Sequence, residues 1–355
     1  MKEVFQILIE GTGTNKVFTS YLFYNSFLPQ LHYYFLTHKD KDLIINFSEI
    51  NKISPLVIPN LLNVGAILKD YFKNPCRLIF PWNQKLISYL KDIRFISLNE
   101  NLNLFKLNED VVKIIETRKI VSESCYTTEI LYGKNKSDIY NNHYKEYNKK
   151  LYDILNDNKV EVNYELEKEV DNIIKMLVEL CHNGANHSNS YCFTTFQLNK
   201  QNKFEISVSD CGIGFYKSFE NKIKNKEYKL KFIQNEELLN LDDNKKNLYS
   251  IIEAIYFRYD KSDAPYESKY GLFDIFNSIL KKRKGVIRFH TENSQIILTE
   301  YIYNKLINDN NQSNTINNNK IISLIKSKND NIKIFEHKYK GVHIELEIPL
   351  NINKQ

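Results

Sequence analysis

Cysteine is scarce in this 355-residue chain and follows no metal-binding spacing. The five cysteines form no Cys-x-x-Cys pair and have no partner histidines at zinc-ligand intervals, which argues against a structural zinc site. Reduced thiols are typical of cytosolic proteins. The cysteines stand at positions 76, 125, 181, 192 and 211.

Long apolar runs and long basic runs are absent as well. No apolar stretch approaches the roughly 20 residues that cross a membrane, and Lys2 and Glu3 stand where a signal peptide needs an apolar core. The 49 basic and 43 acidic residues leave a formal charge of only +6, which does not demand nucleic-acid binding. We expect a soluble, cytoplasmic protein without a membrane or nucleic-acid partner.

Glycine is also rare, with ten residues in the whole chain. Glycine lets the backbone approach a ligand closely because no side chain intervenes. Six of the ten lie in the second half of the chain, beside the motifs described next, at positions 184, 212, 214, 271, 285 and 341.

Three polar side chains recur at four-residue intervals in the apolar segment 163–188, which predicts a helix. Four residues are close to one helical turn, so Glu179, Asn183 and His187 form a single stripe. Most apolar residues of the segment fall on the remaining, core-directed surface. A carboxylate, a carboxamide and an imidazole on one stripe indicate a polar ligand above it.

An acidic residue and two glycines follow at the end of an expected strand. Residues 191–198 and 203–209 alternate between apolar and polar side chains and predict a hairpin, whose second strand delivers Asp210, Gly212 and Gly214. Asp and Gly are also common in ordinary strand-end turns. The preceding polar stripe makes a ligand site the favoured interpretation.

These two segments resemble the N box and the Asp-x-Gly-x-Gly box of the GHKL superfamily, over residues 160–350. The resemblance implies that Asn183 holds Mg2+ against the triphosphate of ATP, that Glu179 orients or activates the attacking group, and that Asp210 accepts from the adenine amino group. His187 contacts phosphate or caps the helix end, and the cap is favoured.

Further segments are similar to the rest of that family. Residues 215–270 correspond to its lid, and Lys269, Gly271 and Leu272 to its second glycine box, although Lys269 replaces the usual glycine and is either a phosphate contact or an ordinary solvated charge. Residues 285–301 predict another hairpin and residues 304–330 a polar, Asn-rich insertion. The closing strand, residues 340–350, has Val342 where the family has threonine.

The N-terminal residues 1–105 alternate strands with helices and predict an α/β unit. This region is similar to STAS-like domains that pair with GHKL partners in bacterial stress signalling. Residues 10–16 lack the Gly-Lys-Ser/Thr ending of a phosphate loop and predict a turn. Ser54, before Pro55, fits a phosphoacceptor or a helix N-cap, and the cap is favoured.

Residues 106–162 predict a helical connector, because apolar and aromatic residues recur there at helical spacing. This helix bridges the two domains, mediates self-association in a homodimer, or packs on its own domain. His143 lies in it without the neighbours of a phosphoacceptor histidine, which counts against autophosphorylation on histidine.

The sequence therefore predicts an α/β (α+β) chain: a STAS-like domain, a connector, and a GHKL α/β two-layer sandwich over residues 163–350 that binds ATP and Mg2+. The expected function is that of a slow ATPase or Ser/Thr protein kinase gated by a protein partner, and the expected macromolecular contact is a protein partner or phosphoacceptor. The alternative is a non-catalytic, nucleotide-sensing interaction module.

Overall fold

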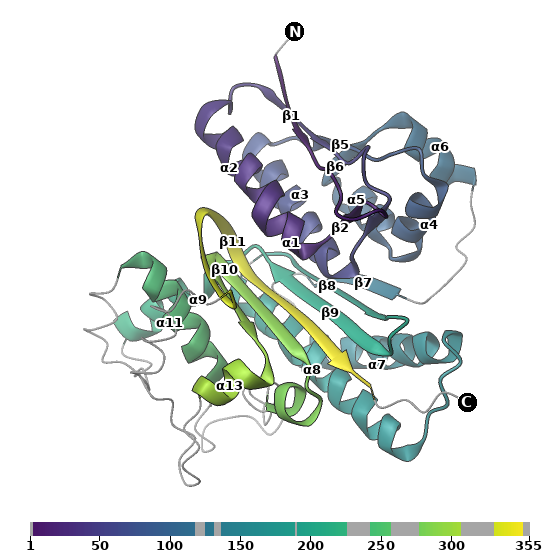
Figure 1. Ribbon diagram of the computed structural model, residues 1–355, viewed down its shortest axis with the longest axis vertical. Helices are drawn as coiled ribbons and strands as arrows, with labels where there is room; N and C mark the ends of the chain where they lie inside the picture. The colour runs from purple at the N-terminus through teal and green to yellow at the C-terminus, as the bar shows by residue number, and fades with distance from the viewer. Residues whose placement is uncertain are drawn as a thin grey trace.

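The computed structural model describes residues 3–117, 125–130, 136–188, 190–225, 242–256, 277–306 and 330–350. The chain is a mixed α/β protein, as the sequence predicted at this level, and its described residues form a four-stranded parallel sheet, a five-stranded antiparallel sheet and a two-stranded parallel ribbon (Figure 1). Within these residues, no helix combines the length and the apolar character that crossing a membrane requires.

The N-terminal sheet is parallel and has the strand order β1-β3-β5-β6. The strands are β1 (Val4–Leu8), β3 (Asp42–Asn46), β5 (Cys76–Ile79) and β6 (Phe105–Leu107). Parallel neighbours need crossover connections, and helices supply them here: α1 (Ser20–Leu22), η1 (Phe23–Phe27), α2 (Leu28–Thr37), η2 (Pro55–Val57), α3 (Ile58–Phe72), α4 (Gln84–Asp92) and α5 (Phe95–Leu102). A small parallel ribbon joins β2 (Val17–Phe18) to β4 (Lys52–Ile53).

Two local expectations in this region meet different outcomes. The turn expected at residues 10–16 is confirmed, since Gly13 has a positive φ of 68° and its carbonyl accepts from Lys16 N at 3.1 Å. Ser54 stands at the N-cap of η2 with Pro55 as the first helical residue, yet its side chain makes no capping hydrogen bond. The carbonyl of Ser54, rather than its hydroxyl, accepts from Val57 N at 3.1 Å at the start of this helix.

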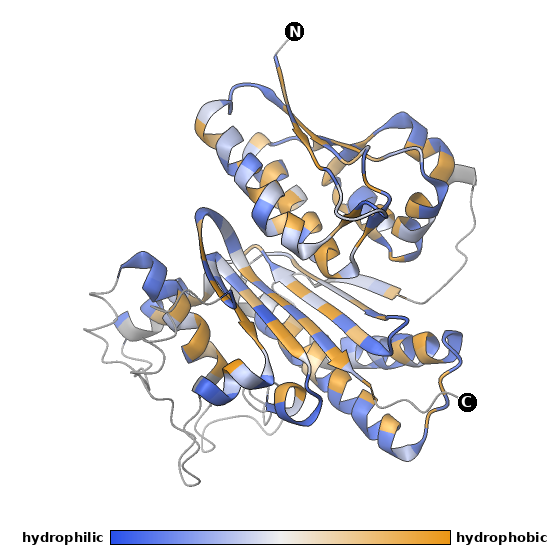
Figure 2. Cartoon of the chain, viewed as in Figure 1, coloured by the Kyte–Doolittle hydropathy of each residue, from blue (hydrophilic) through white to orange (hydrophobic). Residues whose placement is uncertain are grey.

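The second sheet is antiparallel and has the order β10-β11-β9-β8-β7. Its strands are β7 (Cys125–Ile130), β8 (Cys192–Leu198), β9 (Lys203–Asp210), β10 (Val286–Leu298) and β11 (Ile332–Pro349). Figure 2 shows hydrophobic and hydrophilic residues alternating along these strands, the pattern of a sheet whose two faces meet different surroundings.

The predicted hairpin over residues 191–209 is confirmed as β8 and β9, which pair from Cys192–Asp210 to Leu198–Phe204. The hairpin expected over residues 285–301 is wrong. Those residues form the single strand β10 and the start of α13 (Glu300–Leu306), because register shifts on either side of Glu292 bend the strand without reversing it.

The expected helical connector is only partly helical. Its helices are α6 (Glu109–Thr117) and α7 (Lys136–Asp157), and between them β7 pairs with β8 along the edge of the second sheet. The local sequence pattern did not predict this edge strand, because its partner strand β8 lies more than 60 residues further along the chain.

Helices cover both faces of the antiparallel sheet (Figure 1). On one face, α7 and α8 (Tyr164–Ser188) pack with α9 (Gly214–Lys224), α11 (Asp243–Tyr256) and η3 (Ser278–Lys282) around one apolar core. On the other face, α2 contacts β11 and α3 contacts β8 and β9. The N-terminal helices therefore lie between the two sheets.

The interface between α3 and the antiparallel sheet is polar at its centre, because two asparagines of α3 lie there. Asn60 and Asn63 are fully buried. Asn60 donates from Nδ2 to Glu345 Oε1 at 3.4 Å and accepts at Oδ1 from Ser209 Oγ at 2.8 Å. Asn63 Oδ1 accepts from Cys211 Sγ at 2.9 Å.

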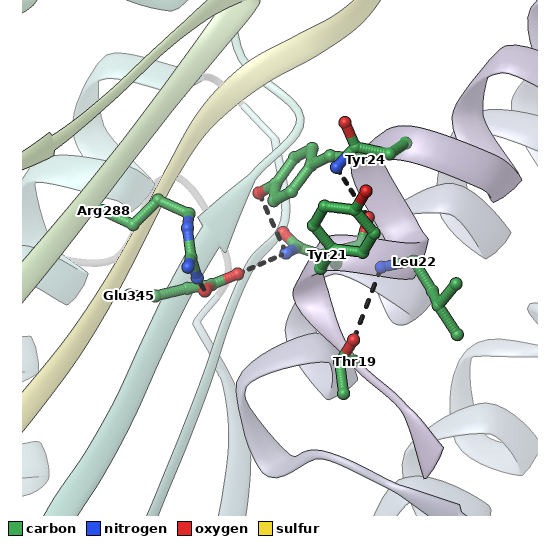
Figure 3. Close-up of polar contacts among 8 residues, drawn as sticks. Thr19, Tyr21, Leu22, Tyr24, Arg288 and Glu345 are labelled. Atoms are coloured by element: carbon green, nitrogen blue, oxygen red, sulfur yellow. Dashed lines mark hydrogen bonds and ion pairs between the residues drawn. The ribbon is translucent and has the colours of Figure 1, made fainter. Parts of the chain in front are cut away.

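A buried ion pair completes this interface. Glu345 of β11 pairs with Arg288 of β10, and the hydroxyl of Tyr24 accepts from Asn60 Nδ2 at 3.2 Å (Figure 3). Burial raises the pKa of Glu345, and the charge of Arg288 opposes this rise. Because every partner lies in a different element, the polar groups fix the register between the two layers.

Candidate functional site

Helix α8 brings Glu179 and Asn183 together. Asn163 Oδ1 accepts from Leu166 N at 2.9 Å near the start of this helix, and Glu165 and Glu167 occupy its first turn, where carboxylates are favourable. One turn apart, Asn183 donates from Nδ2 to Glu179 Oε1 at 3.2 Å. Both side chains are half-buried.

The apolar side of α8 is the side that the sequence predicted. Ile173, Ile174 and Leu177 are buried in the core together with Leu180 and Cys181. The polar stripe thus lies away from the centre of the core. His187 falls within the last turn of α8, but its side chain lies outside the described part of the chain.

Asp210 is the last residue of β9 and is buried. Its Oδ1 accepts from Gly212 N at 2.7 Å and from Val342 N at 3.4 Å. Burial raises its pKa to about 7, against the opposing effects of these two N–H groups and of the Lys340 charge. Near neutral pH this carboxyl is therefore divided between its protonated and ionised forms.

Gly184 brings the two motifs side by side. A Cβ placed on Gly184 would lie 2.5 Å from Cys192 Sγ and 3.9 Å from the Cβ of Asp210. Only glycine allows α8 to approach β8 and β9 this closely. The turn of α8 that carries Asn183 consequently lies beside the strand end that carries Asp210.

Three glycines shape the backbone around Asp210. Gly341 has a φ of 104°, and a Cβ on it would lie 1.8 Å from the carbonyl oxygen of Asp210. Gly214 has a φ of 75° and begins α9. Gly212 contributes the N–H that Asp210 accepts. These glycines let two chain segments cross at the strand end.

Thr291 belongs to this site, although the sequence gave no reason to select it. Its Oγ1 is buried, donates to the carbonyl of Gly341 at 3.0 Å, and lies 2.9 Å from where a Cβ of Gly214 would be. The resemblance implies a threonine hydroxyl at position 342, where this chain has valine. The hydroxyl of Thr291, on β10, lies close to that position, because it donates to the carbonyl of the neighbouring Gly341. A sequence signal existed only in the irregular polar stretch at residues 290–295, within an otherwise apolar strand.

The described parts of the expected lid, residues 215–270, are packed helices. In α11, Leu248, Ile251 and Ile255 are buried, and Asn247 donates from Nδ2 to Asn293 Oδ1 at 3.1 Å. The apolar face of α11 is therefore part of the core, because its apolar residues recur at helical spacing and the helix packs on β10. Lys269, Gly271 and Leu272 lie outside the described residues.

The site offers oxygen ligands but no cage of acidic or imidazole groups. Among the described residues, no three His, Cys, Asp or Glu side chains are grouped so that they could hold a metal ion. Mg2+ commonly keeps several waters and takes one or two protein oxygens beside those of a phosphate. The amide oxygen of Asn183 suits that partial coordination.

A cavity of about 140 Å³ lies elsewhere, lined by residues of α2, α3 and β11 that include none of Glu179, Asn183 and Asp210.

The comparisons with known proteins give no further guidance: no family model, no curated protein and no solved structure matches this chain.

We expect Gly341→Ala to destabilise the protein by several kcal/mol, because its Cβ would overlap the carbonyl of Asp210 at a φ that L-residues rarely adopt. Gly13→Ala is the matched control, since Gly13 also has a positive φ but has nothing within 4 Å of the added Cβ. The control should lose only about 1 kcal/mol. Urea unfolding of both variants measures the difference, and equal losses would show that the contact is not restrictive.

Asp210 should make stability fall with rising pH. Its folded-state pKa of about 7 exceeds the unfolded value of 3.8, so proton binding favours the folded state at low pH, and this contribution is lost as pH rises from about 4 to about 7. Asp210→Asn removes this contribution, while the buried His290, His337 and His343, whose pKa values are lowered by burial, contribute in the opposite direction in both proteins. At pH 8 the variant should be more stable than the wild type by roughly 2–4 kcal/mol, since one pKa unit is worth about 1.4 kcal/mol.

Urea unfolding at pH 5 and pH 8 tests this expectation, with the exposed residue in Asp40→Asn as the control. The control should follow the wild type at both pH values. A stability difference between Asp210→Asn and the wild type that is the same at pH 5 and at pH 8 would contradict the assignment.

Proposed function

We propose that this chain binds Mg-ATP with a GHKL-type α/β sandwich built from β7–β11 and the helices α7, α8, α9 and α11. It acts as a slow ATPase or Ser/Thr protein kinase whose activity a protein partner controls. The observation that carries the proposal is the close packing at Gly184, which brings the Glu179–Asn183 turn of α8 beside Asp210 at the end of β9.

The Asp210 end fits adenine. Its carboxyl is held between the backbone N–H groups of Gly212 and Val342, which fix its orientation. An ionised carboxylate accepts from the exocyclic amine of adenine. Guanine presents a carbonyl oxygen at the corresponding position, which a carboxylate repels.

The Asn183 end fits the cation and the phosphates. Asn183 donates a hydrogen bond from Nδ2 to Glu179. Its amide oxygen is the type of atom that Mg2+ prefers as a ligand. Bound Mg-ATP supplies the phosphoryl group and the cation that offsets its charge. Glu179 takes the proton of the attacking water or acceptor hydroxyl, an effect typically worth about 10²–10⁴-fold in rate.

The N-terminal region is the proposed regulatory part, a STAS-like domain that receives the partner signal. Ser209 and Cys211, on either side of Asp210, bond to Asn60 and Asn63 of α3. A partner that shifts α3 therefore acts on residues next to the adenine end. Ser54, half-exposed at the start of η2, is the candidate phosphoacceptor in this region.

Glu179→Gln tests the chemical step. Glutamine can still accept from Asn183, so ATP affinity should stay within about threefold while turnover falls about 100-fold or more. Asn183→Ala should instead weaken ATP binding about tenfold, and only when Mg2+ is present. Calorimetric titration with ATP and with a non-hydrolysable analogue, followed by a phosphate-release assay, measures both effects.

Glu167→Ala, an exposed carboxylate on the same helix, is the control and should behave as the wild type. Unchanged turnover in Glu179→Gln would remove the base role. Wild-type protein that binds ATP in a Mg2+-dependent way and releases no phosphate, alone or with partner, would favour the nucleotide-sensing alternative. Absence of ATP binding would overturn the proposal.

Asp210→Asn tests the reading of adenine independently. At pH 8.5, above the raised pKa of Asp210, the wild type should prefer ATP over GTP at least about tenfold, because a buried carboxylate opposes the guanine carbonyl. Asparagine donates to that carbonyl as well as accepting from an amine, so the ratio should fall toward one. Competitive titration of the two nucleotides gives the ratio, and an unchanged preference would place adenine elsewhere.

A further inference from the structure

A cavity of about 140 Å³ lies where the N-terminal helices meet β11, the elements that stand side by side in Figure 1. Its apolar walls come from two helices: Leu28, Leu31 and Phe35 on α2, and Val64, Ile67 and Leu68 on α3. An apolar cavity of about 150 Å³ is large enough for a benzene ring. The volume thus fits one ring or one branched aliphatic group.

The remaining lining gives the cavity a positive side. Lys338, Tyr339 and Lys340 of β11 line it, together with His32 of α2, and no carboxylate does so. Lys338 and Lys340 are exposed, and neither pairs with an acidic side chain within the part of the chain that the structure describes. Flexible lysine stems can bring an ammonium group to the opening while their methylenes cover apolar surface.

We propose that this cavity is a binding site for a small amphipathic carboxylate, with a ring-sized apolar body inside and the anionic group at the lysine side. The apolar part gains affinity by leaving water, and the carboxylate gains it from the cationic edge. The lining of this cavity includes none of Glu179, Asn183 and Asp210, and the proposal does not depend on the nucleotide assignment.

The position of the cavity gives its occupant a structural effect. Tyr339, part of the lining, donates from its hydroxyl to the carbonyl of Asn60 at 2.8 Å, across the boundary between β11 and α3. A ligand in contact with α2, α3 and β11 binds all three only in the assembled fold. Occupancy should therefore raise the midpoint of thermal unfolding.

Calorimetric titration of the full chain with phenylacetate, phenylacetamide and acetate tests the site. Phenylacetate should bind about tenfold more tightly than phenylacetamide, and acetate should not bind measurably, because the buried ring supplies most of the affinity and the charge adds to it. In the double variant Lys338→Met/Lys340→Met, phenylacetate affinity should fall to that of the amide, whose own affinity should not change. Lys106→Met, an exposed lysine on β6, is the control and should bind as the wild type.

Ile67→Trp is the blocking variant, because Ile67 is half-buried and a larger side chain there fills the cavity. It should abolish binding of both phenyl ligands while the unfolding midpoint stays at or above that of the wild type. Failure of both phenyl ligands to bind the wild type would overturn the proposal. The proposal would also be overturned if Ile67→Trp bound the phenyl ligands as tightly as the wild type. The same holds if the Lys338→Met/Lys340→Met variant bound phenylacetate as tightly as the wild type.

Discussion

The crossing of β11 over the end of β9 is the contact on which the candidate site depends. Gly341 passes so close to the carbonyl of Asp210 that no side chain fits between them, and its φ of 104° suits glycine. Thr291 holds the carbonyl of Gly341 from β10. This crossing buries the carboxyl of Asp210 and supplies the Val342 N–H that it accepts, so backbone geometry sets the pKa of the residue at the centre of the site.

Side chains of β9 point alternately to the two faces of the sheet, and this connects the N-terminal helices to the strand end that carries Asp210. Asp210 lies on the side of α8, where it meets Gly184, whereas Ser209 and Cys211 point to the other face and bond to asparagines of α3. Successive residues of one strand thus serve the site and the interface between layers. Any shift of α3 against the sheet acts on the two neighbours of Asp210, which gives the N-terminal region a short physical route to the site.

Local patterns were enough to predict α8, the β8–β9 hairpin and the position of Asp210 at a strand end. They failed where the partner of a segment lies far along the chain. The edge strand β7 depends on β8, the single strand β10 depends on a bulge opposite β11, and the apolar face of α11 is buried because β10 packs on it. Asn60 and Asn63 stood at helical spacing in an apolar helix, but asparagine is so frequent in this chain that their burial could not be recognised.

The sequence by itself determined that α8 is helical, that β8 and β9 are extended, and which of their residues carry polar chemistry, because period and turn chemistry act over a few residues. It also placed Glu179 and Asn183 one turn apart, and hence in contact. Only the tertiary structure decided that Gly184 seats this turn beside Asp210, that Thr291 and Gly341 close around it, and that α3 covers the opposite face of the sheet. Those contacts join residues dozens to hundreds of positions apart, and close packing, which no local pattern encodes, selects them.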